Sequence, residues 1–234
     1  MSRNQIHSTA IVEGDVAMGE GNSIGPYCVL SGPLVLGDDN RIGPHAVIGS
    51  AGDEIWRRRH DASGKRVEIG SRCTIREHTT VHKPVYGDLT RIGDDVYLMH
   101  GAYVAHDARL ANGAVLAQNT AIGGVSRVLE GGYVAIGAVL HQRTVCGHYA
   151  IVGAAAAATK SVRPFTRHVP GQPPTLNAYA IERYGLEAHR EEIERYFQTG
   201  RPPEAGRFAD MVVEYDRLVR ETERGEYWIA ERPR

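Results

Sequence analysis

The sequence is short of aromatic residues and of any excess of one charge. Of its 234 residues only 3 are Phe, 2 are Trp and 11 are Tyr, whereas 27 are Gly. Few rings and many glycines suit a fold of repeated tight corners better than a helical core. The 27 basic and 28 acidic residues leave a net charge of −1, which argues against nucleic acid or a membrane surface as a bulk partner.

Cysteines and long apolar runs are also scarce. Cys28, Cys73 and Cys146 form no CxxC pair, so we interpret them as reduced packing residues. No stretch approaches the roughly 18 apolar residues of a membrane-spanning helix. The N-terminal segment MSRNQIHSTAIVEG has no apolar signal region. These absences predict a cytoplasmic protein that does not insert into a membrane.

An aliphatic or similar residue recurs at every sixth position. The longest uninterrupted series comprises Ile92, Leu98, Val104, Leu110, Leu116, Ile122, Val128, Val134, Leu140, Cys146, Val152 and Ala158. The next residue is most often Gly or Ala. An earlier series with the same period comprises Ile6, Val12, Met18, Ile24, Leu30, Leu36, Ile42 and Ile48.

A period of six matches neither a helix of 3.6 residues per turn nor a simple alternating strand. It is typical of a parallel β-helix, in which each hexapeptide makes one flat face of a coil and three faces close a turn of about 18 residues. The aliphatic side chain is expected to point inward, and the small residue after it leaves room for the corner. The sequence therefore predicts an all-β coil over residues 1–162. Its handedness does not follow from periodicity.

Two interruptions break the repeat. Residues 51–66 are charged and lack the period, so we expect a loop that leaves one corner, and loops on rigid scaffolds often carry function. This loop contains Trp56 followed by Arg57, Arg58 and Arg59, a possible binding edge for an acidic carrier protein or a nucleotide phosphate. A charge run is more commonly a solvated surface. The second interruption spans residues 83–91.

The repeat ends in a proline-rich stretch, and the rest of the chain changes period. Proline density at 159–175 argues against a helix interior or a central strand there. We expect a transition over residues 163–185 and a helical C-terminal region over 186–234. Helical patterns occupy 186–197 and 208–224. These helices are expected to cover the open end of the coil and prevent pairing at its edge.

With the repeat in register, the chain resembles the acyl-carrier-protein-dependent UDP-N-acetylglucosamine O-acyltransferases of lipid A synthesis. The specific matches are IGPYCV (24–29), VEIGSRCTIREHTTVH (67–82), GDLTRIGDD (87–95), LMHGAYVAHDARLANGAVLAQNTAIGG (98–124), LHQ (140–142) and TLNAYAIERYGL (175–186). The resemblance implies a left-handed β-helix, a homotrimer, and a site between adjacent subunits. It implies acyl transfer from the pantetheine thioester of an acyl carrier protein to a sugar-nucleotide hydroxyl, with no other cofactor required.

In that family a histidine removes the proton from the attacking hydroxyl. The position that matches it here is Val125, which cannot accept a proton. The resemblance therefore implies a divergent member with an altered acceptor, a hydroxyl or an amine, and either carrier protein or acyl-CoA as donor. A catalytically inactive homologue that only binds ligand is an alternative.

Other family positions are retained unevenly. His106 and Asp107 match an AHD motif, and His141 with Gln142 matches an HQ motif near the bound nucleotide sugar. The remaining positions that the resemblance places in substrate binding are Asp53, Glu54, His82, Asn177 and Arg183. Tyr103 replaces a family histidine.

His100 is absent from the family pattern and occupies the hexapeptide slot equivalent to that of His106. We therefore take His106 and His100 as candidate bases, since imidazole titrates near neutral pH. The alternative for each is a hydrogen-bonded corner residue. A further hypothesis is a metal-dependent lyase or hydrolase of the γ-carbonic anhydrase type, in which His82, His100 and His106 would bind zinc across a subunit interface.

Overall fold

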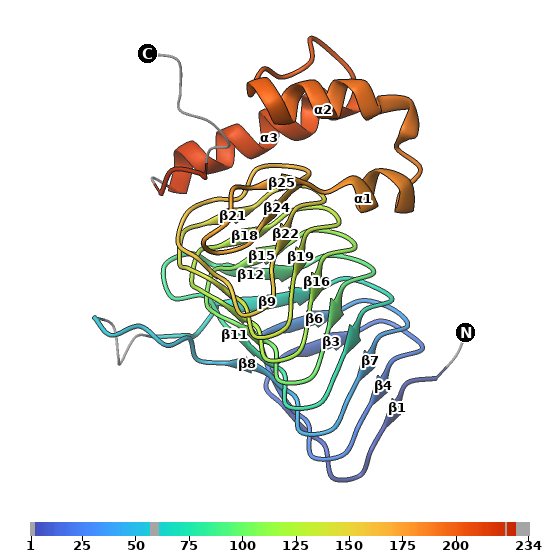
Figure 1. Ribbon diagram of the computed structural model, residues 1–234. Helices are drawn as coiled ribbons and strands as arrows, with labels where there is room; N and C mark the ends of the chain where they lie inside the picture. Colours follow the sequence, from blue (N-terminus) through green and yellow to red (C-terminus); the bar gives the residue numbers. More distant parts are fainter. Residues whose placement is uncertain (1–2, 57–60, 223, 228–234) are drawn as a thin grey trace.

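The chain winds into a coil of short strands that ends under a layer of helices. The computed structural model describes residues 3–56, 61–222 and 224–227. Within these residues the strands form three sheets, one on each face of a triangular coil (Figure 1). The helices lie across the end of the coil opposite the N-terminus (Figure 1).

The three faces are named sheets A, B and C. Sheet A contains β1 (Gln5–Ile6), β4 (Ser23–Ile24), β7 (Arg41–Ile42), β10 (Thr74–Ile75), β13 (Tyr97–Leu98), β16 (Val115–Leu116), β19 (Tyr133–Val134), β22 (Ile151–Val152), β24 (Thr166–His168) and β25 (Thr175–Leu176). Sheet B contains β2 (Ile11–Glu13), β5 (Val29–Ser31), β8 (Val47–Ser50), β11 (Thr80–His82), β14 (Tyr103–Val104), β17 (Ala121–Ile122), β20 (Val139–Leu140) and β23 (Ala157–Ala158). Sheet C contains β3 (Val16–Met18), β6 (Leu34–Leu36), β9 (Arg66–Ile69), β12 (Leu89–Ile92), β15 (Arg109–Leu110), β18 (Arg127–Val128) and β21 (Val145–Cys146).

The six-residue repeat forms the core, as predicted. In the uninterrupted part, residues 18 apart are parallel partners, so Leu98 lies beside Leu116 and Val104 beside Ile122. These side chains are buried inside the coil. The first coil is the exception, because Ile6 has no coil beneath it and is 47% exposed.

The small residue after each repeat position is required by the neighbouring coil. A Cβ added to Gly123 would lie 2.4 Å from the backbone nitrogen of Gln142 in the next coil. The second residue of many corners has a left-handed backbone, for example Asp107 (φ 60°), Val125 (φ 63°) and Arg143 (φ 60°). These three corner residues are 18 apart and therefore stack at one corner, between sheets B and C.

The C-terminal helices cover the last coil. They are α1 (Ala178–Arg183), the 3₁₀ turn η1 (Glu187–His189), α2 (Arg190–Thr199) and α3 (Arg207–Thr222). Phe165 and Tyr149 of the coil pack with Ile181, Phe208 and Val212 of the helices in a shared buried cluster. The predicted helices at 186–197 and 208–224 are confirmed. Among the described residues, no helix is both long and apolar enough to cross a membrane.

Two expectations for the ends of the repeat are wrong. The proline-rich stretch contains β24, a strand that pairs with β22 on one side and antiparallel with β25 on the other. Pro164 is accommodated because it lies in the corner before this strand, where it displaces no ladder hydrogen bond. The second interruption is also shorter than 83–91, since β12 begins at Leu89 and pairs with β9 along four residues.

Candidate functional site

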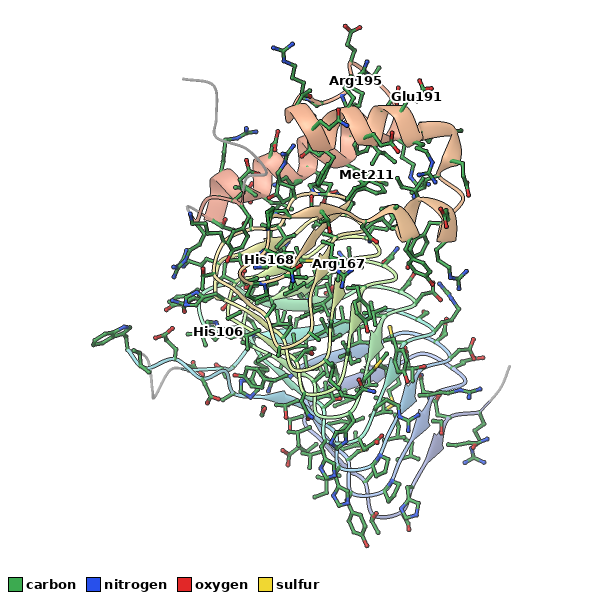
Figure 2. All side chains as sticks on the ribbon, viewed as in Figure 1. His106, Arg167, His168, Glu191, Arg195 and Met211 are labelled. Carbon is green, nitrogen blue, oxygen red and sulfur yellow. The ribbon has the colours of Figure 1, made fainter. Side chains whose placement is uncertain are left out.

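The two interruptions of the repeat meet at one corner, between sheets B and C. The Lys65 Nζ of the first interruption donates a hydrogen bond to the Val85 carbonyl of the second. A cavity of about 480 Å³ lies beside this corner. It is lined by Asp53, Glu54, Ile55, Trp56, Tyr86, Tyr103, Ala105, His106, Ala121, Ile122, Gly123, Gly124, Val125, Val139, Leu140, His141, Gln142 and Arg143. Figure 2 shows His106 on the side of the coil from which the first interruption projects.

Asp107 fixes the second interruption to the corner. Its carboxylate accepts backbone N–H groups from Val85 (2.9 Å), Tyr86 (3.0 Å) and Gly87 (2.7 Å). The same carboxylate lies 2.8 Å from the Nδ1 of His106. A single buried carboxylate thus holds both a loop and an imidazole.

These hydrogen bonds stabilise the charged form of Asp107. Burial alone would raise the pKa of this carboxyl group. The hydrogen bonds from His106 and from the three backbone N–H groups outweigh burial and hold the pKa of Asp107 well below its usual range. Asp107 is therefore an anion at neutral pH, and it orients the neighbouring imidazole.

His106 presents its second ring nitrogen to the cavity. Because Nδ1 donates to Asp107, the Nε2 of neutral His106 carries a lone pair. This Nε2 lies 4.0 Å from the Oε2 of Glu54, the nearest carboxylate of the first interruption. The Tyr86 ring packs edge-on against the imidazole at 5.5 Å, and its hydroxyl donates to Glu54 at 2.8 Å. That hydrogen bond lowers the pKa of Glu54.

A second cluster lies beside the first, on the neighbouring strands β11 and β14 of sheet B. The Tyr103 hydroxyl is 3.4 Å from the Nδ1 of His82, and the Asp53 carboxylate is 3.9 Å from the same nitrogen. Burial lowers the pKa of His82 and raises the pKa of Tyr103 to about 12. His82 is therefore neutral at pH 7, and we regard it as a hydrogen-bonding group rather than a charge.

Val125 occupies the corner directly above Asp107. Its N–H donates to the His106 carbonyl at 3.0 Å, and the adjacent Gly124 lies against the His106 ring. The Arg127 guanidinium braces this corner from the sheet C side, donating to the carbonyls of Asp107 and Val125 at 2.9 Å each. The position that matches the family's base thus lines the cavity, and the histidines that line it are His106 and His141.

Comparison with known proteins supports the resemblance. The profile described as bacterial transferase hexapeptide (six repeats) matches residues 15–50. The acyl-[acyl-carrier-protein]–UDP-N-acetylglucosamine O-acyltransferase of Alkalilimnicola ehrlichii is 34% identical over 157 residues, which are 64% of this chain and 60% of that protein. The enzyme of the same name from Paracoccus denitrificans is 35% identical over 133 residues, 55% of this chain and 50% of that protein. The chain is therefore similar to acyltransferases with hexapeptide repeats over part of their length.

Solved structures confirm the fold of this chain, a left-handed parallel β-helix with a helical C-terminal region. The UDP-N-acetylglucosamine acyltransferase of Francisella novicida superposes with a TM-score of 0.75 at 21% identity, covering 96% of this chain and 94% of that one. The corresponding protein of Bacteroides fragilis gives 0.68 at 21% identity, covering 95% and 97%. The matched sequence spans only about half to 60% of the curated relatives.

The structure brings most of the predicted site residues together. One corner of the coil holds His106, Asp107, Asp53, Glu54 and, at the end of β11, His82. The cavity is also lined from the next coil by His141 and Gln142. Sequence reasoning did not select Tyr86 or Gly124. Tyr86 lies in the second interruption of the repeat, and that position in the sequence could have identified it as a candidate site residue.

Asn177 and Arg183 lie elsewhere in the chain. Asn177 is buried before α1 and its Nδ2 donates to the Tyr149 carbonyl at 2.7 Å. Arg183 is exposed near the end of α1. Neither lines the cavity, so a role in substrate binding stays a prediction for both. Arg57, Arg58 and Arg59 lie outside the described residues, whereas Trp56 lines the cavity and is 85% exposed.

Within one chain, His100 does not line the cavity that His106 lines, so a role for His100 as a base stays a prediction. His100 lies at the corner between sheets A and B, at the end of a column of rings that also contains Tyr27, His45 and His78. Its nearest carboxylate is Glu77, at 3.6 Å. Residues six apart occupy equivalent slots on different faces, so a shared slot does not imply contact.

The zinc hypothesis requires His82, His100 and His106 to meet at one metal ion. His82 and His106 are close enough to interact electrostatically, but the ring of His100 packs against His78 at another corner. Throughout the described ranges, no three His, Cys, Asp or Glu side chains are placed to hold one metal ion. The arrangement of these residues within one chain therefore gives the zinc hypothesis no support.

Gly124 offers a test of the His106 position. A Cβ at residue 124 would lie 2.4 Å from the Cε1 and 2.5 Å from the Nε2 of His106, so Gly124→Ala must displace the imidazole. We expect transfer activity to fall at least tenfold, with a loss of stability of about 1–3 kcal/mol from overpacking.

The control for this variant is Gly43→Ala, whose added Cβ would lie 2.8 Å from the Glu77 nitrogen, away from the cavity. It should lose comparable stability and keep its activity below the melting temperature. Equal losses of activity in both variants would contradict a specific effect on His106.

Proposed function

We propose that this protein is an acyltransferase that moves an acyl group from a pantetheine thioester to the hydroxyl or amine of a sugar nucleotide or related acceptor. The observation that carries the proposal is the His106–Asp107 pair, whose Nδ1–carboxylate contact of 2.8 Å leaves Nε2 directed at a cavity. An imidazole held in this way by a carboxylate is a general base for an attacking hydroxyl.

The reaction requires one proton to travel through His106. Nε2 accepts the proton as the acceptor oxygen or nitrogen attacks the thioester carbonyl carbon. The C–S bond then breaks, and the proton passes from His106 to the departing thiolate. The Gly124 N–H lies beside the imidazole and has no acceptor among the described residues. It is a candidate donor to the oxyanion that forms on the carbonyl.

The choice of donor and acceptor is supported by the relatives. Their names specify acyl carrier protein as the donor carrier and UDP-N-acetylglucosamine as the acceptor. The open cavity at a corner, with exposed Ile55, Trp56 and Val139 beside it, favours a site completed by a neighbouring subunit of a homotrimer. Acyl-CoA is an alternative donor. The location of the protein in the cytoplasm stays a prediction.

A catalytically inactive binding homologue would need the cavity but not the dyad. The Val125 position favours that alternative, because the matched base is missing. However, Asp107 is buried and holds His106 in one orientation with one nitrogen free, an arrangement that ligand binding alone does not require. We therefore favour an active enzyme in which His106 takes over the proton transfer.

The decisive experiment is a transfer assay on the purified chain. Acyl carrier protein and CoA, each loaded with acyl groups of several lengths, would be offered with UDP-N-acetylglucosamine or with its 3-amino analogue. Mass spectrometry would detect the acylated sugar nucleotide. Product from at least one pair is expected. Saturable binding of these ligands without product from any pair would favour the inactive homologue.

A further inference from the structure

Three arginines form a column on the outer face of sheet C. Arg91 on β12, Arg109 on β15 and Arg127 on β18 are direct parallel partners. Neighbouring strands lie about 4.8 Å apart, so the column places three like charges at close spacing. Like charges on adjacent strands are destabilising. The column therefore concentrates positive charge at a cost in stability, which a bound anion would offset.

The carboxylates near this column already have partners. The short contacts are Glu68 with Arg66 at 2.6 Å, Glu130 with Arg207 at 2.7 Å, Glu214 with His148 at 3.2 Å and Glu221 with Arg217 at 2.6 Å. Over the described residues, Arg91 and Arg109 have no carboxylate within 4.0 Å. Both side chains are exposed and remain available to a ligand.

The column lines a groove rather than a flat surface. A cavity of about 520 Å³ lies over sheet C, with α3 forming one wall through Arg217, Leu218 and Glu221. Arg127 is half-buried at its floor, and burial together with repulsion from Arg109 lowers the pKa of Arg127 to about 10. A dianion bound here would relieve that repulsion.

The groove adjoins the corner that carries the candidate base. The Nη1 of Arg127 donates to the carbonyls of Asp107, Val125 and Ser126 at 2.9, 2.9 and 3.1 Å. The cavity with His106 thus lies on one side of this corner and the arginine groove on the other.

We propose that the arginine groove binds the diphosphate of a nucleotide. Guanidinium groups bind phosphate oxygens in bidentate pairs, and a column of three at strand spacing fits two linked phosphates. The diphosphate has two possible sources, the nucleotide part of acyl-CoA or the nucleotide part of the acceptor. This inference rests on the proposed function for the choice of a nucleotide, but diphosphate binding can be measured without any turnover.

The test is isothermal titration calorimetry of the whole chain with inorganic pyrophosphate, CoA and UDP-N-acetylglucosamine. We expect pyrophosphate to bind, with an affinity that falls as the salt concentration rises. Pyrophosphate should also compete with either CoA or UDP-N-acetylglucosamine, and the nucleotide that it displaces is the source of the diphosphate. In the double variant Arg91→Ala, Arg109→Ala, the affinity for pyrophosphate and for that nucleotide should fall at least tenfold.

Three further variants keep the result interpretable. Arg41→Ala removes an exposed strand arginine from sheet A and should leave all affinities unchanged. Arg91→Lys, Arg109→Lys retains the charge and should recover only part of the affinity. His106→Ala should bind pyrophosphate normally even if it transfers no acyl group, which separates this inference from the proposed function.

Unchanged pyrophosphate affinity in the double alanine variant would overturn the inference. If light scattering of that variant also shows a changed oligomeric mass, the column is instead a contact between subunits.

Discussion

Replacing His106 by alanine is expected to reduce acyl transfer by roughly 10²–10⁴-fold, the usual contribution of a general base. Nε2 of His106 is directed at the cavity, while Nδ1 donates to the Asp107 carboxylate. A hydroxyl acceptor should show the larger loss. An amine acceptor that is unprotonated at neutral pH needs less help from a base. Initial rates with both acceptors under saturating donor would measure the difference.

Two further variants distinguish the loss of the base from a loss of folding. His106→Asn can still donate a hydrogen bond to Asp107 but cannot accept a proton at neutral pH, so it should fold well and remain inactive. His100→Ala changes a histidine at another corner and should keep its activity. Wild-type rates in both His106 variants would remove His106 from the mechanism.

Replacing Asp107 by asparagine is expected to cost both stability and activity. Three backbone N–H groups and the His106 imidazole donate to this carboxylate. An amide cannot accept all four, so the second interruption loosens and the imidazole loses its orientation. We expect the free energy of unfolding to fall by on the order of 3 kcal/mol and transfer to fall at least a hundredfold.

The pH dependence of stability identifies the Asp107 contribution. The folded-state pKa of Asp107 is depressed below that of the unfolded chain, which is about 3.9. Its stabilising effect is therefore fully present above pH about 4 and is lost as the pH falls through the folded-state pKa. Urea unfolding at pH 7 and pH 3 should show a smaller acid-induced loss in Asp107→Asn than in the wild type.

Asp53→Asn is the matched control for Asp107→Asn. Asp53 lines the same cavity, but its side chain is 81% exposed and its contact with His82 is 3.9 Å. Its replacement should change the free energy of unfolding by no more than about 0.5 kcal/mol. If Asp107→Asn were equally mild, the clamp between the corner and the second interruption would not be a significant source of stability.

Much of the scaffold could be predicted because it repeats. A period of six residues and a turn of 18 residues place every third repeat position in the same inward column. Leu98, Leu116 and Val134 form such a column. The steric need for a small residue at Gly123 and the helix patterns at the C-terminus are equally visible in the sequence. Local interactions between neighbouring coils decide these features, so a local pattern encodes them.

The same reasoning locates the two interruptions in the sequence, but it does not predict their conformations. Glu54 and Tyr86 belong to segments without a period, and 32 residues separate them along the chain. Their hydrogen bond depends on where both loops cross the corner. His106 and His100 occupy equivalent hexapeptide slots on successive faces, and the coil keeps their side chains apart.

By itself, the sequence determined the left-handed coil through its repeat and family motifs, the helical region after it, and the loss of a base at Val125. Only the tertiary structure decided that His106, and not His100, faces the cavity with Asp107 behind it. It also decided that Arg91, Arg109 and Arg127 line one groove. The physical reason is that a repeat of six fixes whether a side chain points inward, whereas the three-faced coil and its two loops fix which side chains meet.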